Sequence, residues 1–226
     1  MHEFVVSLHK NFDLYKNPAI ASGQKAYMRN QFDFLGIKTP ERKKLISSLL
    51  KKESLPQKKS LKEIIKKLWE FPEREYQYAA IDVLSKYKNK WEEKDIDLIE
   101  YLIQKKSWWD TVDALAIRLA GNFFENFPDL KNQRTEKWIR SKNIWLQRSA
   151  LLFQLKYKHK TDIRLMEYAI GQLKNTDEFF LNKAIGWILR EYGKTNPEWV
   201  KNFVVKNKLH PLSQREALKI IGKSQF

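Results

Sequence analysis

Apolar residues recur along most of this chain at the three-to-four-residue spacing of amphipathic helices. Clear examples are IIKKLWEF (64–71), IDLIEYLI (96–103) and WVKNFVVK (199–206). This spacing places the apolar side chains on one face of a helix. No segment shows sustained two-residue alternation between turn signals, and only seven glycines and seven prolines punctuate the chain. The pattern therefore predicts an all-α protein.

Two helix starts are marked by their polar residues. Ser107 is followed three residues later by Asp110, which resembles a capping box, a pair of side chains that binds the free backbone N–H groups of a helix start. Asn196-Pro197 places proline at a first helical position, where its missing N–H has no helical partner to lose. We therefore expect helices to begin just after Ser107 and Asn196.

The helical pattern repeats along the chain. Four segments align without gaps at a spacing of 35 residues: EREYQYAAIDVLSKY (73–87), WWDTVDALAIRLAGN (108–122), NIWLQRSALLFQLKY (143–157) and EFFLNKAIGWILREY (178–192). A second amphipathic stretch follows each of them, such as DIRLMEYAIGQL (162–173). A helix pair that repeats at about 35–45 residues is typical of HEAT-like or TPR-like arrays. The Trp, Gly and Tyr positions of TPR repeats are absent, so a HEAT-like repeat is the better prediction.

The repeats predict one chain-long domain over residues 1–226. The helices before about residue 60 fit the 35-residue frame poorly, so we expect residues 1–60 to form an atypical N-terminal cap. Stacked helix pairs curve, and their concave side presents equivalent positions from successive repeats. We therefore expect a helical array with a concave groove.

Composition adds a strong positive charge to this picture. The chain has 43 Lys and Arg against 27 Asp and Glu, a formal net charge of +16. Such an excess favours an anionic partner, either nucleic acid or a membrane surface. The absence of cysteine excludes disulfides, zinc ribbons, iron–sulfur clusters and thiol nucleophiles. The chain shows no signal peptide and no apolar run of membrane length, so we expect a cytoplasmic protein.

One row of equivalent positions contains an unexpected acid. The 35-residue frame aligns Tyr78, Asp113, Arg148 and Lys183, which is too polar a set for the core. Asp110 is explained by a helix start, whereas Asp113 lies one turn deeper, on the same face as Trp109 four residues before it. A single acid weakens phosphate binding by its basic neighbours. The row therefore indicates an anion-binding groove that contains one acid, and phosphate binding does not explain the presence of this acid.

Structural explanations compete with functional ones for the other candidates. Trp109 and Trp187 align with apolar positions, so periodicity alone favours packing roles for both. Most lysines on a helical array are solvated surface residues. The four histidines have no metal-ligand spacing, and no glycine-rich phosphate loop is present, so neither a metal nor a cofactor is expected. From composition and periodicity alone, a non-catalytic scaffold that binds nucleic acid or an acidic protein is the favoured interpretation.

Longer motifs reverse this preference for a non-catalytic scaffold. SWWDTVD (107–113), NIWLQR (143–148), LLFQLKYK (151–158), NKAIGWILREYGKTNP (182–197), FLGIKTPER (34–42) and KLWEFPERE (67–75) resemble the AlkD family of bacterial alkylpurine DNA glycosylases over essentially the whole chain. The resemblance implies a HEAT-like fold that binds double-stranded DNA in its concave basic groove. It also implies hydrolysis of the N-glycosidic bond of N3- and N7-alkylated purines, chiefly 7-methylguanine and 3-methyladenine, in base excision repair.

The resemblance also assigns roles to individual residues. It implies that Trp109, Asp113 and Trp187 act at the reaction centre and that Arg148 supports the DNA backbone near the lesion. Further residues resemble DNA-contacting positions, and Lys183 joins them through its place beside Arg148 in the polar row: Tyr27, Thr39, Lys156, Arg190 and Lys183. Lys38 stands where the family commonly has a neutral polar residue, so no role is assigned to it.

The chemistry explains the isolated acid. An alkylated purine is already cationic, so it leaves as a neutral base and needs no proton. Asp113 can stabilise the positive charge that develops on the deoxyribose and orient a water molecule. The faces of Trp109 and Trp187 can pack against the same charge. No lysine suited to Schiff-base formation lies beside Asp113, so a monofunctional enzyme is expected. It is expected to act as a monomer and without a tight pocket for the lesion base.

Overall fold

The structure, a computed structural model, describes residues 2–221 of the chain. These residues fold into helices, with one isolated bridge between Asp33 and Glu73 and no β-strand among them. The prediction of an all-α protein is confirmed. The contacts divide the chain into two compact units, Met1–Lys90 and Trp91–Phe226. A single chain-long domain with a concave basic groove stays a prediction.

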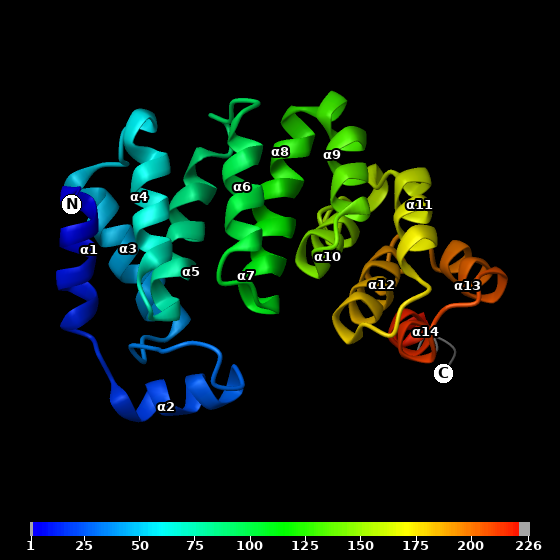
Figure 1. Cartoon of the computed structure of the whole chain (residues 1–226), viewed down its shortest axis with the longest axis horizontal. Helices are drawn as coiled ribbons and strands as arrows, with labels where there is room; N and C mark the ends of the chain where they lie inside the picture. The colour runs from blue at the N-terminus through cyan, green and yellow to red at the C-terminus, as the bar shows by residue number, and fades with distance from the viewer. Residues whose placement is uncertain (1, 222–226) are drawn as a thin grey trace. The chain divides into compact units, whose positions relative to one another are not determined.

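The first unit packs four helices side by side and leaves one apart. α2 has no buried residue and runs crosswise to α1 and α4 at their ends (Figure 1). The elements are α1 (Glu3–Asp13), α2 (Pro18–Tyr27), α3 (Thr39–Glu53), α4 (Lys58–Glu70), α5 (Arg74–Leu84) and the 3-10 helix η1 (Ser85–Tyr87).

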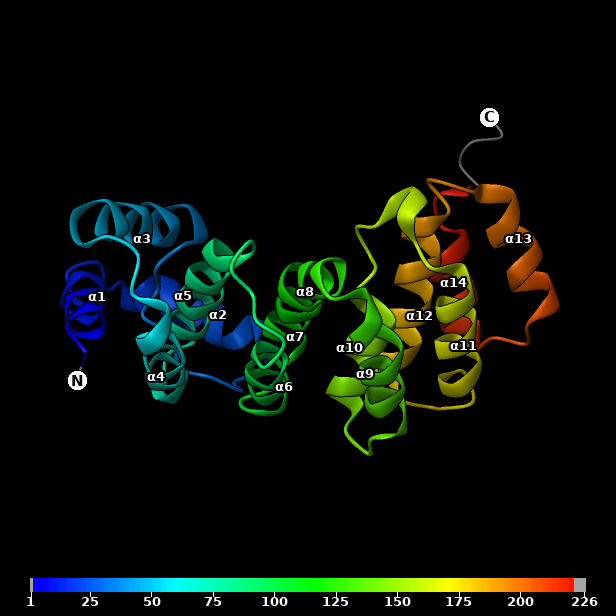
Figure 2. The same cartoon turned by 90° about the horizontal axis from the view of Figure 1, so that it is seen from above.

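The second unit is built from successive helix pairs, and Figure 2 shows the pair α9 and α10 followed by α11 to α14. Its α-helices are α6 (Asp95–Gln104), α7 (Trp109–Ala114), α8 (Gly121–Asn126), α9 (Pro128–Arg140), α10 (Ile144–Leu152), α11 (Ile163–Leu173), α12 (Phe179–Tyr192), α13 (Pro197–Lys206) and α14 (Pro211–Leu218). A π-helix, η2 (Leu115–Ala120), joins α7 to α8, and a 3-10 helix, η3 (Lys158–Lys160), follows α10.

The helix starts follow the 35-residue frame. α5, α7, α10 and α12 begin at Arg74, Trp109, Ile144 and Phe179, each 35 residues after the one before. The second helices of the repeats, α6, α9, α11 and α13, lie between and after them. The helical repeat predicted from the sequence is therefore confirmed.

Equivalent amide side chains bind the turns that lead into three of these four helices. Gln77, Gln147 and Asn182 occupy the same position in their repeats, and each donates to the backbone carbonyl six residues earlier, at 2.9, 2.8 and 2.8 Å respectively. Each amide thus satisfies a carbonyl in the turn that leads into its own helix. Val112 takes this position in the remaining repeat, which therefore has no amide side chain there to bind the preceding turn.

The two marked helix starts have different outcomes. Asn196 caps α13 as predicted, because its side chain accepts the N–H three residues on at 3.0 Å. The prediction of a capping box at Ser107 is wrong, because the Ser107 hydroxyl donates to the Ile103 carbonyl at 2.6 Å. α7 begins at Trp109 after an N-cap, Trp108, that makes no side-chain capping bond. Asp110 still lies in the first turn, where a negative charge is favoured.

A buried carboxylate fixes the segment that leads into α3. The two oxygens of Glu75 accept the backbone N–H groups of Leu35, Gly36 and Ile37 at 3.0, 3.0 and 3.1 Å. Burial raises the pKa of Glu75, although these bonds oppose the shift. Gly36 has φ +88°, and a Cβ there would lie 2.0 Å from the Asn17 carbonyl oxygen. Only glycine therefore fits at this turn, and the start of α3 is held in place from α5.

Candidate functional site

Asp113 and Arg148 meet as a paired carboxylate and guanidinium. Each is the fifth residue of its helix, Asp113 in α7 and Arg148 in α10. Arg148 Nε donates to Asp113 Oδ1 at 2.7 Å, and Nη2 donates to Oδ2 at 2.8 Å. Asp113 is only 9% exposed and Arg148 only 5%. Two neighbours in the polar row thus form a bidentate ion pair between adjacent repeats.

Arg148 has a third partner in the next repeat. Its Nη1 donates to the backbone carbonyl of Phe180, in the first turn of α12, at 2.5 Å. All three nitrogens of the guanidinium are therefore engaged, and the planar fork fixes the orientation of the Asp113 carboxylate. These contacts favour an orienting role for Arg148, and its contact with the DNA backbone stays a prediction.

Burial and pairing act on the charge of Asp113 in opposite directions. Desolvation raises the pKa of Asp113 above its ordinary value of 3.8, Arg148 lowers it by hydrogen bonding and Coulomb attraction, and nearby Asp110 raises it. The net direction is upward. The two N–H groups of Arg148 that face the carboxylate are donors suited to its ionised form.

Three aromatic rings hold the helix starts around this ion pair. Trp108 lies 5.7 Å from Trp145 and 5.2 Å from Phe180 between ring centroids, and Trp145 lies 5.0 Å from Phe180. The three residues stand at the starts of α7, α10 and α12. Trp108 and Trp145 therefore pack the helix starts against one another. Because Phe180 also supplies the carbonyl that binds Arg148, the cluster supports the position of the guanidinium.

The two candidate catalytic tryptophans lie on helices that flank this centre. Trp109 is the first residue of α7, one turn before Asp113 on the same face, and Trp187 lies in α12. Both are half-buried. α10, which contains Arg148, packs against both α7 and α12. The convergence of the two indoles on Asp113 stays a prediction.

The basic candidates in the second unit are paired with glutamates. Lys183 Nζ lies 2.9 Å from Glu216 Oε1, and Arg190 Nη1 donates to Oε2 of the same residue. Lys156 Nζ lies 3.0 Å from Glu191 Oε1. The cations Lys183 and Arg190 lower the pKa of Glu216, the hydrogen bond from Lys183 most strongly. Each of these three basic side chains thus forms an ion pair with a glutamate.

The sequence analysis did not predict that either glutamate pairs with these basic residues. Glu191 lies 35 residues after Lys156, which is the spacing of Asp113 and Arg148, so the repeat frame contained a signal for that pair. Glu216 lies in α14, beyond the four aligned segments, and the frame gave no signal for it.

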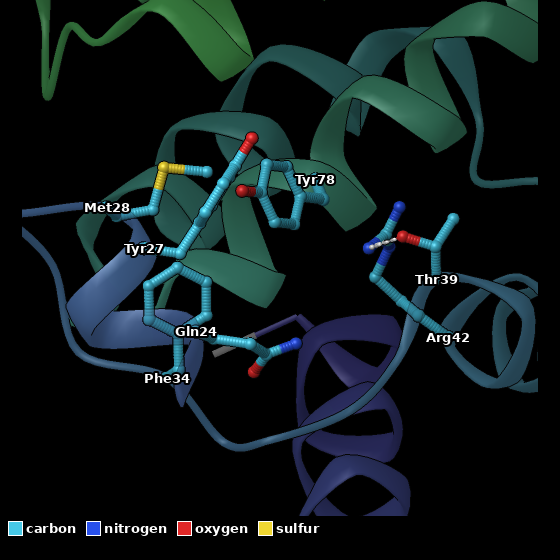
Figure 3. Close-up of a pocket in the computed structure, with 7 residues that line it drawn as sticks. All are labelled: Gln24, Tyr27, Met28, Phe34, Thr39, Arg42 and Tyr78. Atoms are coloured by element: carbon cyan, nitrogen blue, oxygen red, sulfur yellow. Dashed lines mark hydrogen bonds between the residues drawn. The ribbon is translucent and has the colours of Figure 1, made fainter. Parts of the chain in front are cut away.

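The remaining two candidates, Tyr27 and Thr39, lie in the first unit on the wall of one pocket (Figure 3). The pocket has a volume of about 240 Å³ and is lined by Gln24, Tyr27, Met28, Phe34, Thr39, Arg42 and Tyr78. The sequence singled out Tyr78 only as a member of the polar row, and it gave no signal for Gln24 or Arg42.

Within residues 2–221, no three His, Asp or Glu side chains are grouped so that they could hold a metal ion. No helix in this range has the length and apolar character needed to span a bilayer.

Comparison with known proteins gives a family match over nearly the whole chain. Residues 8–221, which include every candidate residue, match the family described as DNA alkylation repair enzyme. A solved structure, "Predicted DNA alkylation repair enzyme from Enterococcus faecalis", is 38% identical and superposes with a TM-score of 0.85. The alignment covers 92% of this chain and 97% of that one. No curated protein matches the chain.

Proposed function

The chain belongs to the DNA alkylation repair enzyme family, and on this premise we propose that it is a DNA glycosylase for cationic N3- and N7-alkylated purines in double-stranded DNA. Its expected substrates are 7-methylguanine and 3-methyladenine, and it acts in base excision repair as a monomer without a cofactor. The observation that supports this proposal best is the Asp113 carboxylate, which is buried and fixed by Arg148 at 2.7 and 2.8 Å.

The reaction needs a stabilised sugar cation more than it needs an acid. The bond between C1′ and the base nitrogen breaks, and its electrons neutralise the positive charge of the alkylated base. The deoxyribose is left as an oxocarbenium-like cation, which the carboxylate of Asp113 stabilises. A water molecule then adds to C1′, and the proton that it loses passes to the carboxylate and on to solvent.

The ion pair leaves Asp113 able to do this. Each carboxylate oxygen has two lone-pair sites, and Arg148 occupies only one on each. The Asp113 side chain keeps 13% of its surface exposed, so a sugar or a water molecule can reach it from one side. In this poorly solvated position its attraction for a positive sugar is stronger than it would be in water.

The other candidates complete the proposed site. Trp109 and Trp187 pack their faces against the sugar, and the attraction increases as positive charge develops. Lys156, Lys183 and Arg190 bind phosphates, and in the first unit Tyr27 and Thr39 contact the duplex. The net charge of +16 supports a polyanionic partner.

Base release is the direct test of the proposed function. A duplex that contains one 7-methylguanine is incubated with the protein in EDTA, and the free base is measured by mass spectrometry. We expect free 7-methylguanine and an abasic site in an uncut strand. Tight binding of the duplex without release of any alkylated base would favour the non-catalytic scaffold, and strand cleavage would contradict monofunctional chemistry.

Replacement of Glu216 is expected to strengthen DNA binding. Glu216→Gln removes the charge that holds Lys183 and Arg190, so both cations become available to phosphates. Affinity for an unmethylated duplex should rise about 3- to 10-fold at 50 mM salt, and the plot of log K against log salt should steepen by roughly one to two units. Fluorescence anisotropy from 50 to 200 mM salt measures both.

Glu198→Gln is the matched control. It also removes one negative charge, but Glu198 is exposed and lies 3.9 Å from a single lysine, Lys201. It should change the affinity only slightly. Equal effects of the two substitutions would show that net charge alone is responsible, and that Lys183 and Arg190 do not bind phosphate.

A further inference from the structure

The pocket in the first unit has the size and walls of a site for a flat ring. α2 contributes Gln24 and Tyr27, α3 contributes Thr39 and Arg42, and α5 contributes Tyr78 (Figure 3). Phe34 adds a third aromatic ring and Met28 a flexible thioether. A volume of about 240 Å³ suits one nucleobase rather than a larger ligand. Tyr27 is 70% exposed at the edge, where it can stack on an incoming ring.

Arg42, which lines this pocket, is poorly satisfied. Its hydrogen bonds to Thr39 Oγ1 and Asp82 Oδ2 are both 3.5 Å long, and its buried Nε has no hydrogen-bond partner within residues 2–221. Arg148, by contrast, makes three bonds of 2.5 to 2.8 Å. The guanidinium of Arg42 also lies 4.7 Å from the centre of the Tyr78 ring. A ligand that brings hydrogen-bond acceptors would stabilise a buried arginine of this kind, because it would complete the hydrogen bonds of the guanidinium.

Gln24 narrows the choice of ligand. Its Oε1 is buried and has no hydrogen-bond partner in the part of the chain that the structure describes, so a ligand in the pocket should also offer a donor. A phosphate or a carboxylate offers acceptors only and would leave this oxygen unsatisfied. A purine that offers acceptors on one edge and N–H groups on another can satisfy both sides of the pocket.

From this geometry we propose that the pocket binds one unstacked guanine base. Guanine presents O6 and N7 together, the pair of acceptors that an arginine fork matches, and its N–H groups can donate to Gln24. Tyr27 stacks on the ring. The base comes either from a DNA strand or from a free guanine nucleoside, and both present the same edges. Nothing in this proposal requires Asp113 or base release.

Binding to unmethylated DNA tests the proposal without catalysis. Labelled duplexes that carry one bulged guanine, adenine or thymine are compared with a fully paired duplex by fluorescence anisotropy. We expect the guanine bulge to bind about 10-fold more tightly than the paired duplex, with a smaller gain for the other two bulges. Tyr27→Ala and Gln24→Ala should each remove most of the gain.

Lys25→Ala is the matched control on the same helix. Lys25 is exposed and pairs with Asp33, and it does not line the pocket, so its loss should weaken all four duplexes alike. α2 has no buried residue, and substitutions in it should leave the thermal midpoint almost unchanged. A preference for guanine that persists in Tyr27→Ala and Gln24→Ala would overturn the proposal.

Guanosine alone distinguishes the two sources. It is titrated into the wild-type protein and Gln24→Ala by isothermal calorimetry. Binding that is lost in Gln24→Ala, without any preference for the bulged duplex, assigns the pocket to a free nucleoside. A preference for the guanine bulge assigns it to DNA. Absence of both overturns the proposal, whatever the outcome of the test for base release.

Discussion

Asp113→Asn is expected to slow the release of 7-methylguanine by about 100- to 1000-fold, the range for loss of one preorganised electrostatic group. The substitution keeps the size of the side chain but removes the negative charge that faces the sugar in the proposed mechanism. It also turns one oxygen into an NH₂ group that points at a donor of Arg148, so the bidentate pair cannot form. Single-turnover release of the free base, measured with excess protein, gives the rate.

Asp110→Asn separates this effect from a general loss of negative charge. Asp110 lies in the first turn of the same helix, and its replacement should change the rate by no more than a few-fold. Anisotropy should show that Asp113→Asn still binds the duplex, because the acid does not attract phosphate. Undiminished release by Asp113→Asn would remove Asp113 from the mechanism.

Arg148→Gln is expected to destabilise the protein and to reduce the rate. The change leaves Asp113 buried without its cation, which lowers the free energy of unfolding by roughly 3–5 kcal/mol at neutral pH. Base release should fall by about 100-fold, because the carboxylate is no longer held in position. Urea unfolding followed by circular dichroism gives the stability, and single-turnover release gives the rate.

The pH dependence identifies the cause of this loss. Without Arg148, the pKa of Asp113 rises further above its value in the unfolded chain. A carboxyl group whose pKa is raised in the folded state lowers the free energy of unfolding by its full amount above that pKa. This destabilisation disappears as the pH falls below the pKa of the group in the unfolded chain. The stability deficit of Arg148→Gln should therefore narrow toward acid pH, and the acid limb of its rate profile should move to higher pH. A deficit that is constant with pH would contradict the ion-pair explanation.

Arg164→Gln is the control for loss of an arginine. Arg164 is exposed on α11, and its replacement should change the free energy of unfolding by less than about 0.5 kcal/mol.

Periodicity predicted the parts of the site that repeat. The helices of the four aligned segments begin 35 residues apart. Asp113 and Arg148 occupy equivalent positions in neighbouring repeats, and such positions approach each other when repeats stack. The sequence therefore indicated that these two charges belong to one row. Their mutual pairing was not predicted, because both were expected to face DNA.

Contacts that depend on the exact end of a helix could not be predicted from the spacing. The carbonyl of Phe180 reaches Arg148 because it lies in the first turn of α12, where its direction depends on local backbone angles. Ser107 fails as a cap for a similar reason, since its hydroxyl binds the preceding helix instead. The pocket beside Tyr27 combines side chains from α2, α3 and α5, which no single periodicity relates.

The division of the ion pair among repeats has a consequence for heat inactivation. Arrays of repeats open by local fraying as well as all at once. Asp113, Arg148 and the Phe180 carbonyl come from three successive repeats, so the proposed catalytic geometry exists only while all three remain stacked. Detachment of α12 to α14 alone would inactivate the protein while most of its helices remain folded. Activity should thus be lost at a lower temperature than helicity.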